Sequence, residues 1–237
     1  MTRTLLSILT TAVALAIAAA ASHAQDSLAY DLSELPVGSI VHKVTAAPVE
    51  YRGRKAIKVE FTEETTRAEF GVSVDNPTFV LIPARFKNGT IEVDVLGRLS
   101  RNAPKDSRAF VGLAYRVVAP DAPFESVYLR PTNGRKKHPP VPRDKRAIQY
   151  FAYPDWKFPR LRAEYPDGRY EAGANIGDDE WIRLRLEIDD SRVRVFVNGE
   201  EELALTESKA TPATGDIGLW VGIGAQGYFA NLRVTPR

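Results

Sequence analysis

The sequence predicts an all-β fold, a sandwich of two antiparallel sheets. Three observations lead to this prediction. Short segments rich in Val, Ile, Tyr and Phe alternate between apolar and polar residues, and they recur along much of the chain. No segment has the sustained apolar spacing of an amphipathic helix. Asn-Gly pairs stand next to several of the alternating segments, as they do in tight hairpins.

The first strands follow from alternation alone. Residues 57–61 and residues 91–95 each place apolar side chains on one face and charged side chains on the other. Residues 182–188 extend this pattern, with four apolar residues facing one side and three charged residues facing the other. Each of these strands should therefore rest one face on a core and expose the other to water.

Turn residues predict how the later strands connect. Asn198-Gly199 can supply the two positive φ angles of a type I′ turn, so residues 193–197 and 201–205 should form a hairpin. The short link Asp189-Asp190-Ser191 should join another antiparallel pair. Further strands are expected at residues 78–82, 109–118, 125–130, 147–153, 217–222 and 228–234. About ten to twelve strands without a helical crossover favour two packed sheets.

The N-terminal segment is predicted to be a secretory signal peptide covering residues 1–24. Arg3 precedes an apolar run, and Ser22-His23-Ala24 offers the small residues of a cleavage site. A transmembrane anchor is the alternative, but the run is largely alanine and has few bulky side chains. We therefore expect an exported protein, periplasmic or extracellular, in which residues 25–237 form a single domain.

The composition excludes several classes of function. The 237 residues contain 32 Lys and Arg against 30 Asp and Glu, which gives no global case for a nucleic-acid partner. The absence of cysteine rules out a disulfide framework, a thiolate nucleophile and a zinc–thiolate site. Beyond residue 24 no apolar run is long enough to span a membrane.

Several short motifs run through the chain from about residue 86 onward. They include Gly89-Thr90-Ile91-Glu92-Val93, Tyr128-Leu129-Arg130-Pro131-Thr132, Glu180-Trp181, Val197-Asn198-Gly199, Gly218-Leu219-Trp220 and Phe229-Ala230-Asn231-Leu232-Arg233-Val234. With these motifs the chain resembles the concanavalin A-like superfamily, in particular its laminin-G-like and 3-keto-disaccharide-hydrolase-like domains. The resemblance implies a jelly-roll sandwich with one curved sheet, whose concave face commonly holds glycans in this superfamily.

The region from residue 125 to residue 162 mixes aromatic and basic side chains. Aromatic rings stack on sugars, and arginine forks bind carboxylates or sulfates. Other basic residues of the region include Arg143, Arg146 and Arg162. A solvated basic loop, pinned to the sandwich by its aromatic residues, is the structural alternative.

Alternation within this region identifies candidate substrate-binding residues. Tyr128 and Arg130 share one face of their strand, and Gln149 and Tyr153 share one face of the next. If these faces lie on the concave side, they form a polar and aromatic platform. The predicted substrate-binding residues are Tyr128, Arg130, Gln149, Tyr153 and Trp156.

The candidate catalytic residues are Glu125, His138 and Tyr153. Jelly-roll polysaccharide lyases use a Tyr and His pair near an Arg or Gln. The resemblance therefore implies this role for Tyr153 or Tyr128 with His138, near Gln149 and Arg130. His138 lies in a solvated run of lysines, which favours a merely exposed position. The E-x-D-x-x-E pattern of related retaining glucanases is absent, because Gly97 follows Glu92 and Asp94 where that pattern requires Glu.

No cofactor and no metal site is expected. The acidic turns at residues 178–180 and 189–190 could hold a structural Ca²⁺, as in many relatives. However, turns are often acidic for other reasons, and no EF-hand spacing is present.

Three hypotheses about function remain open at this stage. The first is a secreted carbohydrate-binding domain that recognises a glycan, in its narrower form an acidic glycan, on the concave sheet. The second is a glycoside hydrolase or polysaccharide lyase of the 3-keto-disaccharide-hydrolase-like type. The third is an envelope-associated module that binds protein. Fold analogy alone does not decide among them.

Overall fold

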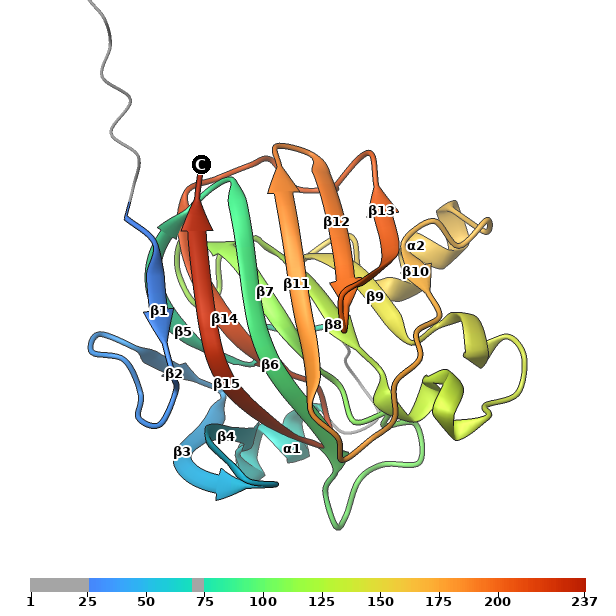
Figure 1. Ribbon diagram of the computed structural model, residues 1–237. Helices are drawn as coiled ribbons and strands as arrows, with labels where there is room; N and C mark the ends of the chain where they lie inside the picture. The colour runs from blue at the N-terminus through green and yellow to red at the C-terminus, as the bar shows by residue number, and fades with distance from the viewer. Residues whose placement is uncertain (1–25, 70–74) are drawn as a thin grey trace, which may run out of the picture.

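The computed structural model describes residues 26–69 and 75–237 and contains two antiparallel sheets packed face to face (Figure 1). Sheet A places the last strand in its middle and the hairpin strands at one edge. Its order is β13 (Glu200–Leu205), β12 (Arg192–Val197), β11 (Ile182–Asp189), β6 (Gly89–Leu99), β15 (Ala225–Pro236), β4 (Arg54–Phe61) and β3 (Val44–Tyr51), with β1 (Leu28–Tyr30) paired to β15.

Sheet B lies behind sheet A in the view of Figure 1 and carries the region of interest. Its order is β10 (Glu171–Ala172), β9 (Ile148–Tyr153), β8 (Phe124–Leu129), β7 (Val111–Val117), β14 (Gly215–Val221), β5 (Phe79–Phe86) and β2 (Ile40–His42). The connecting segments include two short helices and three 3₁₀ turns: α1 (Glu63–Glu69), α2 (Phe158–Glu164), η1 (Pro131–Asn133), η2 (Arg135–Lys137) and η3 (Arg143–Lys145).

The predicted antiparallel sandwich is confirmed. Each segment with clear alternation is part of a strand, and β11 pairs with β12 as the short link between them predicted. Asn198 and Gly199 have φ angles of 52° and 94°, as the predicted hairpin turn requires. The sequence did not predict β1, β2 or β3, whose residues lack a strong apolar alternation, nor the two helices.

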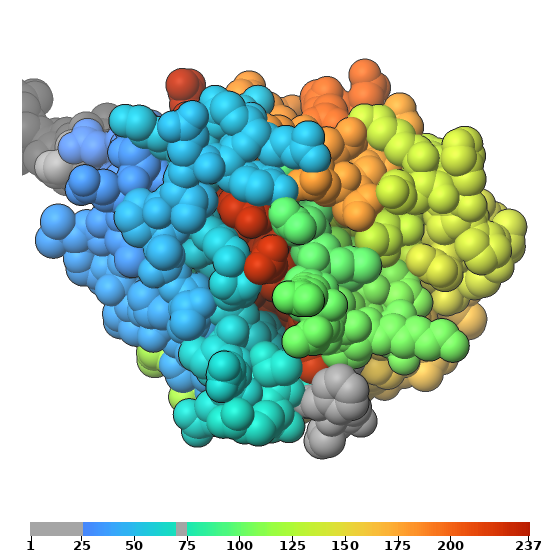
Figure 2. Space-filling model, turned by 90° about the horizontal axis from the view of Figure 1, so that it is seen from below, coloured from blue at the N-terminus to red at the C-terminus, as the bar shows by residue number. Residues whose placement is uncertain are grey.

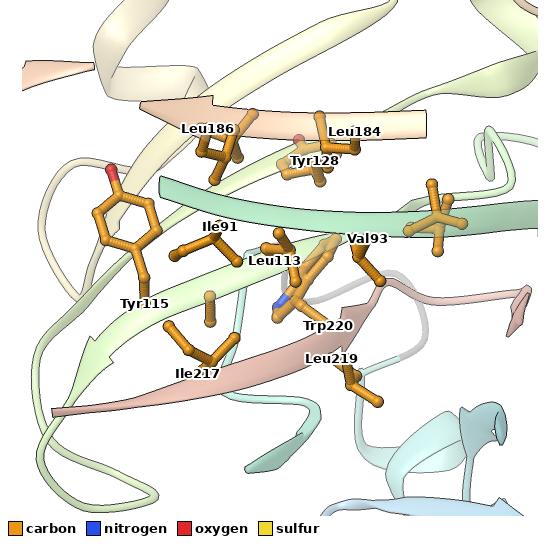
Figure 3. Close-up of a cluster of buried hydrophobic side chains, with 14 of the residues drawn as sticks. Ile91, Val93, Leu113, Tyr115, Tyr128, Leu184, Leu186, Ile217, Leu219 and Trp220 are labelled. Carbon is orange, nitrogen blue, oxygen red and sulfur yellow. The ribbon is translucent and has the colours of Figure 1, made fainter. Parts of the chain in front are cut away.

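The inner faces of the two sheets form the core. Figure 3 shows Ile91 and Val93 of β6 and Leu184 of β11 on one side, and Leu113 of β7 and Leu219 of β14 on the other. All five side chains are fully buried. In β6 and β11 this arrangement places the charged residues between them on the outer face, as the alternation predicted.

The outer face of sheet B is also packed, which differs from the open concave surface that the resemblance implied. Trp220 alternates with the core residue Leu219, so it lies on the outer face, where its ring stacks on Tyr128 with centroids 4.8 Å apart. Phe151 contacts both rings, at 5.6 Å from Trp220 and 5.8 Å from Tyr128. Leu161 of α2, which is 1% exposed, belongs to the same cluster of buried hydrophobic residues. Apolar rings on this face require a cover, and α2 with the residues after 75 provides it.

Among the described residues, no helix is long and apolar enough to cross a bilayer. The predicted signal peptide, residues 1–24, lies outside the described residues, so it remains a prediction.

Candidate functional site

A cavity with a volume of about 690 Å³ lies at one end of the outer face of sheet B. Its walls come from the ends of β8 and β14, the loop before β7, the turns η1 and η3, helix α2 and the segment from β4 to α1. Figure 2 shows this end of the molecule. A furrow runs between the blue to cyan residues of β3, β4 and α1 and the green residues around 100–110. Red residues of the C-terminal strands form its base.

Cationic and aromatic side chains dominate the lining of this cavity. The arginines are Arg108, Arg130, Arg143, Arg146 and Arg162. The aromatic residues are Phe61, Phe110, Tyr128, Phe158 and Trp220. We call this cavity the arginine pocket. Such a lining combines the two kinds of group that grip charged sugars, guanidinium forks and flat apolar faces.

Three of the predicted binding residues converge beside this pocket. Arg130 Nη2 donates hydrogen bonds to Tyr128 Oη at 2.8 Å and to Gln149 Oε1 at 3.1 Å. The strand register explains the convergence, because Tyr128 of β8 is paired with Gln149 of β9. Gln149 is fully buried and donates to the carbonyls of Tyr150 and Tyr170 at 2.6 and 3.3 Å. Gln149 therefore orients Arg130 rather than contacting a ligand.

Glu171 forms ion pairs with three of the five arginines. Its Oε1 accepts from Arg130 Nη1 at 2.7 Å and from Arg162 Nη2 at 2.5 Å, and Arg146 Nε lies 3.5 Å from its Oε2. Burial opposes the ionisation of Glu171, but hydrogen bonds from Arg162 and the charge of Arg130 outweigh it and lower its pKa. The sequence reasoning missed Glu171, which reaches the site because β10 pairs with β9 opposite Gln149.

A pH dependence follows from this carboxylate. Since the pKa of Glu171 lies below its ordinary value of 4.5 in the folded chain, its ionisation stabilises the fold above that pH, and the stabilisation is lost as the pH falls further. We expect Glu171→Gln to be less stable than the wild type at about pH 7, with a difference that narrows towards about pH 3. Urea unfolding across this pH range measures the difference in stability, with Glu164→Gln, at an exposed position, as the control. A difference independent of pH would contradict the assignment.

Asp75 is a second carboxylate at the pocket that the sequence reasoning missed. Its Oδ2 accepts a hydrogen bond from the backbone N–H of Phe158 at 2.8 Å. Burial raises the pKa of Asp75. The hydrogen bond from Phe158 and the charge of Arg130 lower it, but the effect of burial is larger. Burial likewise raises the pKa of Tyr128 well above its ordinary value, so this hydroxyl stays protonated and serves as a hydrogen-bonding group.

Tyr153 and Trp156 lie apart from the other three predicted binding residues. They line a second cavity of about 370 Å³, formed with Glu125 and Lys209 among others. Their rings are already in contact with other side chains. Tyr153 stacks on Phe124 at 5.3 Å and has Lys157 Nζ over its ring at 5.3 Å. Trp156 has the guanidinium carbon of Arg160 3.8 Å from its ring centroid and Lys209 Nζ at 5.1 Å. The five residues thus do not form one platform.

The candidate catalytic residues do not assemble into one group either. Glu125 is fully buried, where its Oε2 pairs with Arg116 Nη1 at 2.7 Å and its Oε1 accepts from Tyr150 Oη at 2.8 Å. His138 is exposed at the end of η2, in the left-handed backbone conformation, and lines neither cavity. Only Glu125 and Tyr153 share a cavity, and the carboxylate of Glu125 is held by its two partners.

The acidic turns that suggested Ca²⁺ are engaged with cations and hydrogen-bond donors. Lys137 pairs with Asp178 at 2.8 Å, Lys136 pairs with Glu180 at 2.8 Å, and Asp179 accepts from Tyr51 at 2.7 Å and from Arg52. In the part of the chain that the structure describes, no group of three or more His, Cys, Asp and Glu could hold a metal ion. The carboxylates of residues 178–180 are thus already paired with cations or hydrogen-bond donors.

Comparison with known proteins identifies the fold. No family model and no curated protein matches the sequence. A protein of unknown function with a galectin-like fold from Bacillus subtilis superimposes with a TM-score of 0.50 and 9% identity, covering 90% of this chain and 99% of that one. The chain has the concanavalin A-like jelly-roll fold. The resemblance seen in the sequence is thereby confirmed at the level of fold.

Two further solved structures are similar at lower scores. The carbohydrate-binding module CBM66 from Bacillus subtilis has a TM-score of 0.47 and 11% identity, covering 81% of this chain and 96% of that one. The β-glucanase from Bacillus licheniformis has a TM-score of 0.47 and 12% identity, covering 90% and 99%. At such identities, similarity of structure describes the jelly roll and leaves the chemistry to the site itself.

Proposed function

We propose that this jelly-roll domain binds carbohydrate in the arginine pocket, and that the carbohydrate is an acidic glycan. The observation that carries the proposal is the lining of the pocket, where five arginines and five aromatic residues meet on the outer face of sheet B. The volume of about 690 Å³ suits a short stretch of an oligosaccharide. The proposal includes export of the chain to the periplasm or the cell exterior, in keeping with the predicted signal peptide.

The charge of the lining supports an acidic ligand. Besides the arginines, the pocket is lined by Lys105 and by the carboxylates of Glu69, Asp75 and Asp106. Cations therefore outnumber carboxylates at the surface a ligand would meet. A guanidinium binds a carboxylate or a sulfate through two parallel hydrogen bonds, which fixes orientation as well as charge.

Aromatic walls supply the apolar part of the site. Phe110 is half-buried at the pocket, edge-on to Tyr128 with ring centroids 5.8 Å apart. It also packs over Gly222, where an added Cβ would come within 2.8 Å of the Cβ of Phe110. Gly222 thus lets the ring lie flat along the pocket wall, where it offers a surface for the C–H groups of a sugar.

Titration of the purified domain with a panel of oligosaccharides tests the proposal. The panel pairs uronate-containing and sulfated chains with neutral chains, and calorimetry is combined with analysis of products. We expect heat of binding with acidic chains and no cleavage. Phe110→Ala should weaken this binding by about 0.5–1.5 kcal/mol. Trp181→Ala, just before β11 and outside the pocket, should not. If cleavage products appear, the domain is a hydrolase or lyase and not a binding module. If no glycan binds, the proposal is wrong.

A further inference from the structure

Two of the five arginines differ from the others in their surroundings. Arg108 lies in the loop before β7, and Arg143 begins η3, so they approach the pocket from two separate segments. Arg130, Arg146 and Arg162 gather around Glu171, as described above. In the described part of the chain, no carboxylate is hydrogen-bonded to Arg108 or Arg143. The nearest acid to Arg108 is Asp106, at 3.9 Å, and the side chain of Asp106 is 99% exposed to solvent.

Both guanidinium groups are held in place by neutral acceptors. Arg108 Nη1 donates to the carbonyls of Lys105 and Ser107 at 2.8 and 2.7 Å. Arg143 Nε donates to Asn133 Oδ1 at 2.9 Å, and Asn133 in turn donates to the carbonyl of Arg146 at 3.0 Å. Among the described residues, these bonds leave Arg108 Nη2 and both Nη atoms of Arg143 without a hydrogen-bond acceptor. Each arginine is therefore fixed at one side and has donors to spare.

Both guanidinium groups line the pocket, and the charge of Arg143 acts on Arg108. Burial lowers the pKa of Arg108, and the positive charges of Arg143 and Arg130 lower it further. Like charges held together in a partly dehydrated pocket disfavour one another unless an anion lies between them. An oxyanion bound here would relieve this repulsion and would accept the spare N–H groups.

We infer that Arg108 and Arg143 form an anion subsite that holds one carboxylate or sulfate group of the glycan and determines the preference for charged over neutral chains. The inference rests on the proposed function and assigns its charge selectivity to two residues. The arginines around Glu171 then shape the wall of the pocket, and their donors are partly used by that carboxylate. A uronic acid and a sulfate ester offer the same chemistry, a singly charged group with several acceptor oxygens.

Charge-removing variants test the subsite against matched controls. The test variants are Arg108→Gln, Arg143→Gln and their combination. The controls are Arg101→Gln and Lys145→Gln, which remove the same charge from exposed positions of the same two segments and do not line the pocket. The probes are a uronate-containing oligosaccharide with its carboxyl-reduced form, a sulfated oligosaccharide with its desulfated form, and inorganic sulfate alone. Whichever charged chain binds identifies the source of the anion.

We expect each single test variant to lose about 10- to 100-fold in affinity for the charged chain, with the affinity for its neutral form unchanged. The combined variant should bind both forms equally, and the controls should keep the wild-type preference. Arg108→Lys with Arg143→Lys should recover part of the preference, because charge is kept while the fork is lost. Thermal unfolding confirms that each variant is folded.

Two results would overturn the inference while leaving carbohydrate binding intact. In one, the combined Gln variant keeps its preference for the charged chain. In the other, the control variants lose as much affinity for the charged chain as the test variants, which would mean that the overall charge of the domain sets the preference. If the wild type binds none of the oligosaccharides, the proposed function fails instead. In that case, sulfate binding that the combined variant loses would support the anion subsite, and no sulfate binding would reject it.

Discussion

Arg116→Met should lower the free energy of unfolding by about 3–5 kcal/mol, because it leaves a buried carboxylate without its partner. The side chains of Arg116 and Glu125 are 2% and 1% exposed, and their charged atoms lie 2.7 Å apart. Arg116 also donates to the carbonyls of Lys87 and Asp190, each at 2.8 Å, and to Asn88 at 2.9 Å. The variant therefore removes the anchor of two turns together with one half of an ion pair.

Chemical denaturation measures this loss, and a double variant separates its causes. Arg116→Met with Glu125→Leu removes both charges, so it should be considerably more stable than Arg116→Met alone. A loss below about 1 kcal/mol in the single variant would contradict a structural role for this pair. The result also tests the sequence-based prediction that Glu125 is a catalytic residue, since a carboxylate needed for the ion pair has a structural role.

Trp220→Ala should be the most damaging change at the pocket, with a loss of about 3–5 kcal/mol in stability. The indole is 2% exposed, stacks on Tyr128 and contacts Phe151 on the outer face of sheet B. Its Nε1 donates to the carbonyl of Asn76 at 2.8 Å, which ties the covering segment to the sheet. Removing the ring opens a hole beneath the floor of the arginine pocket.

The conservative variant Trp220→Phe serves as the control. It keeps most of the packing and loses the hydrogen bond to Asn76, so we expect a loss of about 0.5–1.5 kcal/mol. Urea unfolding gives both values. Trp220→Ala should also bind glycan less well wherever it remains folded, since Tyr128 and Phe110 lose their support. An alanine variant as stable as the phenylalanine variant would mean that the outer face of sheet B contributes little to the fold.

The fold was predictable because alternation determines which side chains face the core. The pattern in residues 182–188 leaves only one orientation of β11 that buries Leu184 and its neighbours, and Asn198-Gly199 fixes the next turn. The same reasoning could not find β2 and β3, whose residues stay half-exposed at the edges of their sheets. It also could not foresee that α2 would cover the outer face of sheet B, because a helix of seven residues gives too little periodicity.

The candidate site was predictable in part. Alternation and register together bring Tyr128, Arg130 and Gln149 into contact. Tyr153 has the same orientation as Gln149, but four residues of extended strand carry it about 13 Å along β9, towards the other cavity. Trp156 follows it there. Sequence reasoning could place residues on a face, and it could not tell how far along the face each one lies.

The remaining site residues come from segments without periodic pattern. Arg108 and Asp75 lie in the loops before β7 and β5, and tertiary packing alone brings them to the end of β8. Arg143 belongs to the basic and aromatic region that the sequence indicated as a candidate binding region. Arg146 pairs with Glu171 and Arg143 does not, and this contrast depends on where Glu171 lies in the fold. Charge balance of this kind depends on distances in space, which composition does not contain.

A crystal structure of the domain with the tightest-binding acidic oligosaccharide tests the central claim most directly. We expect the sugar to lie in the arginine pocket, with its ring against Phe110 and its anionic group within hydrogen-bond distance of Arg108 and Arg143. A sugar seated in the cavity beside Tyr153 and Trp156, or on the outer face of sheet A, with the arginine pocket unoccupied, would contradict it.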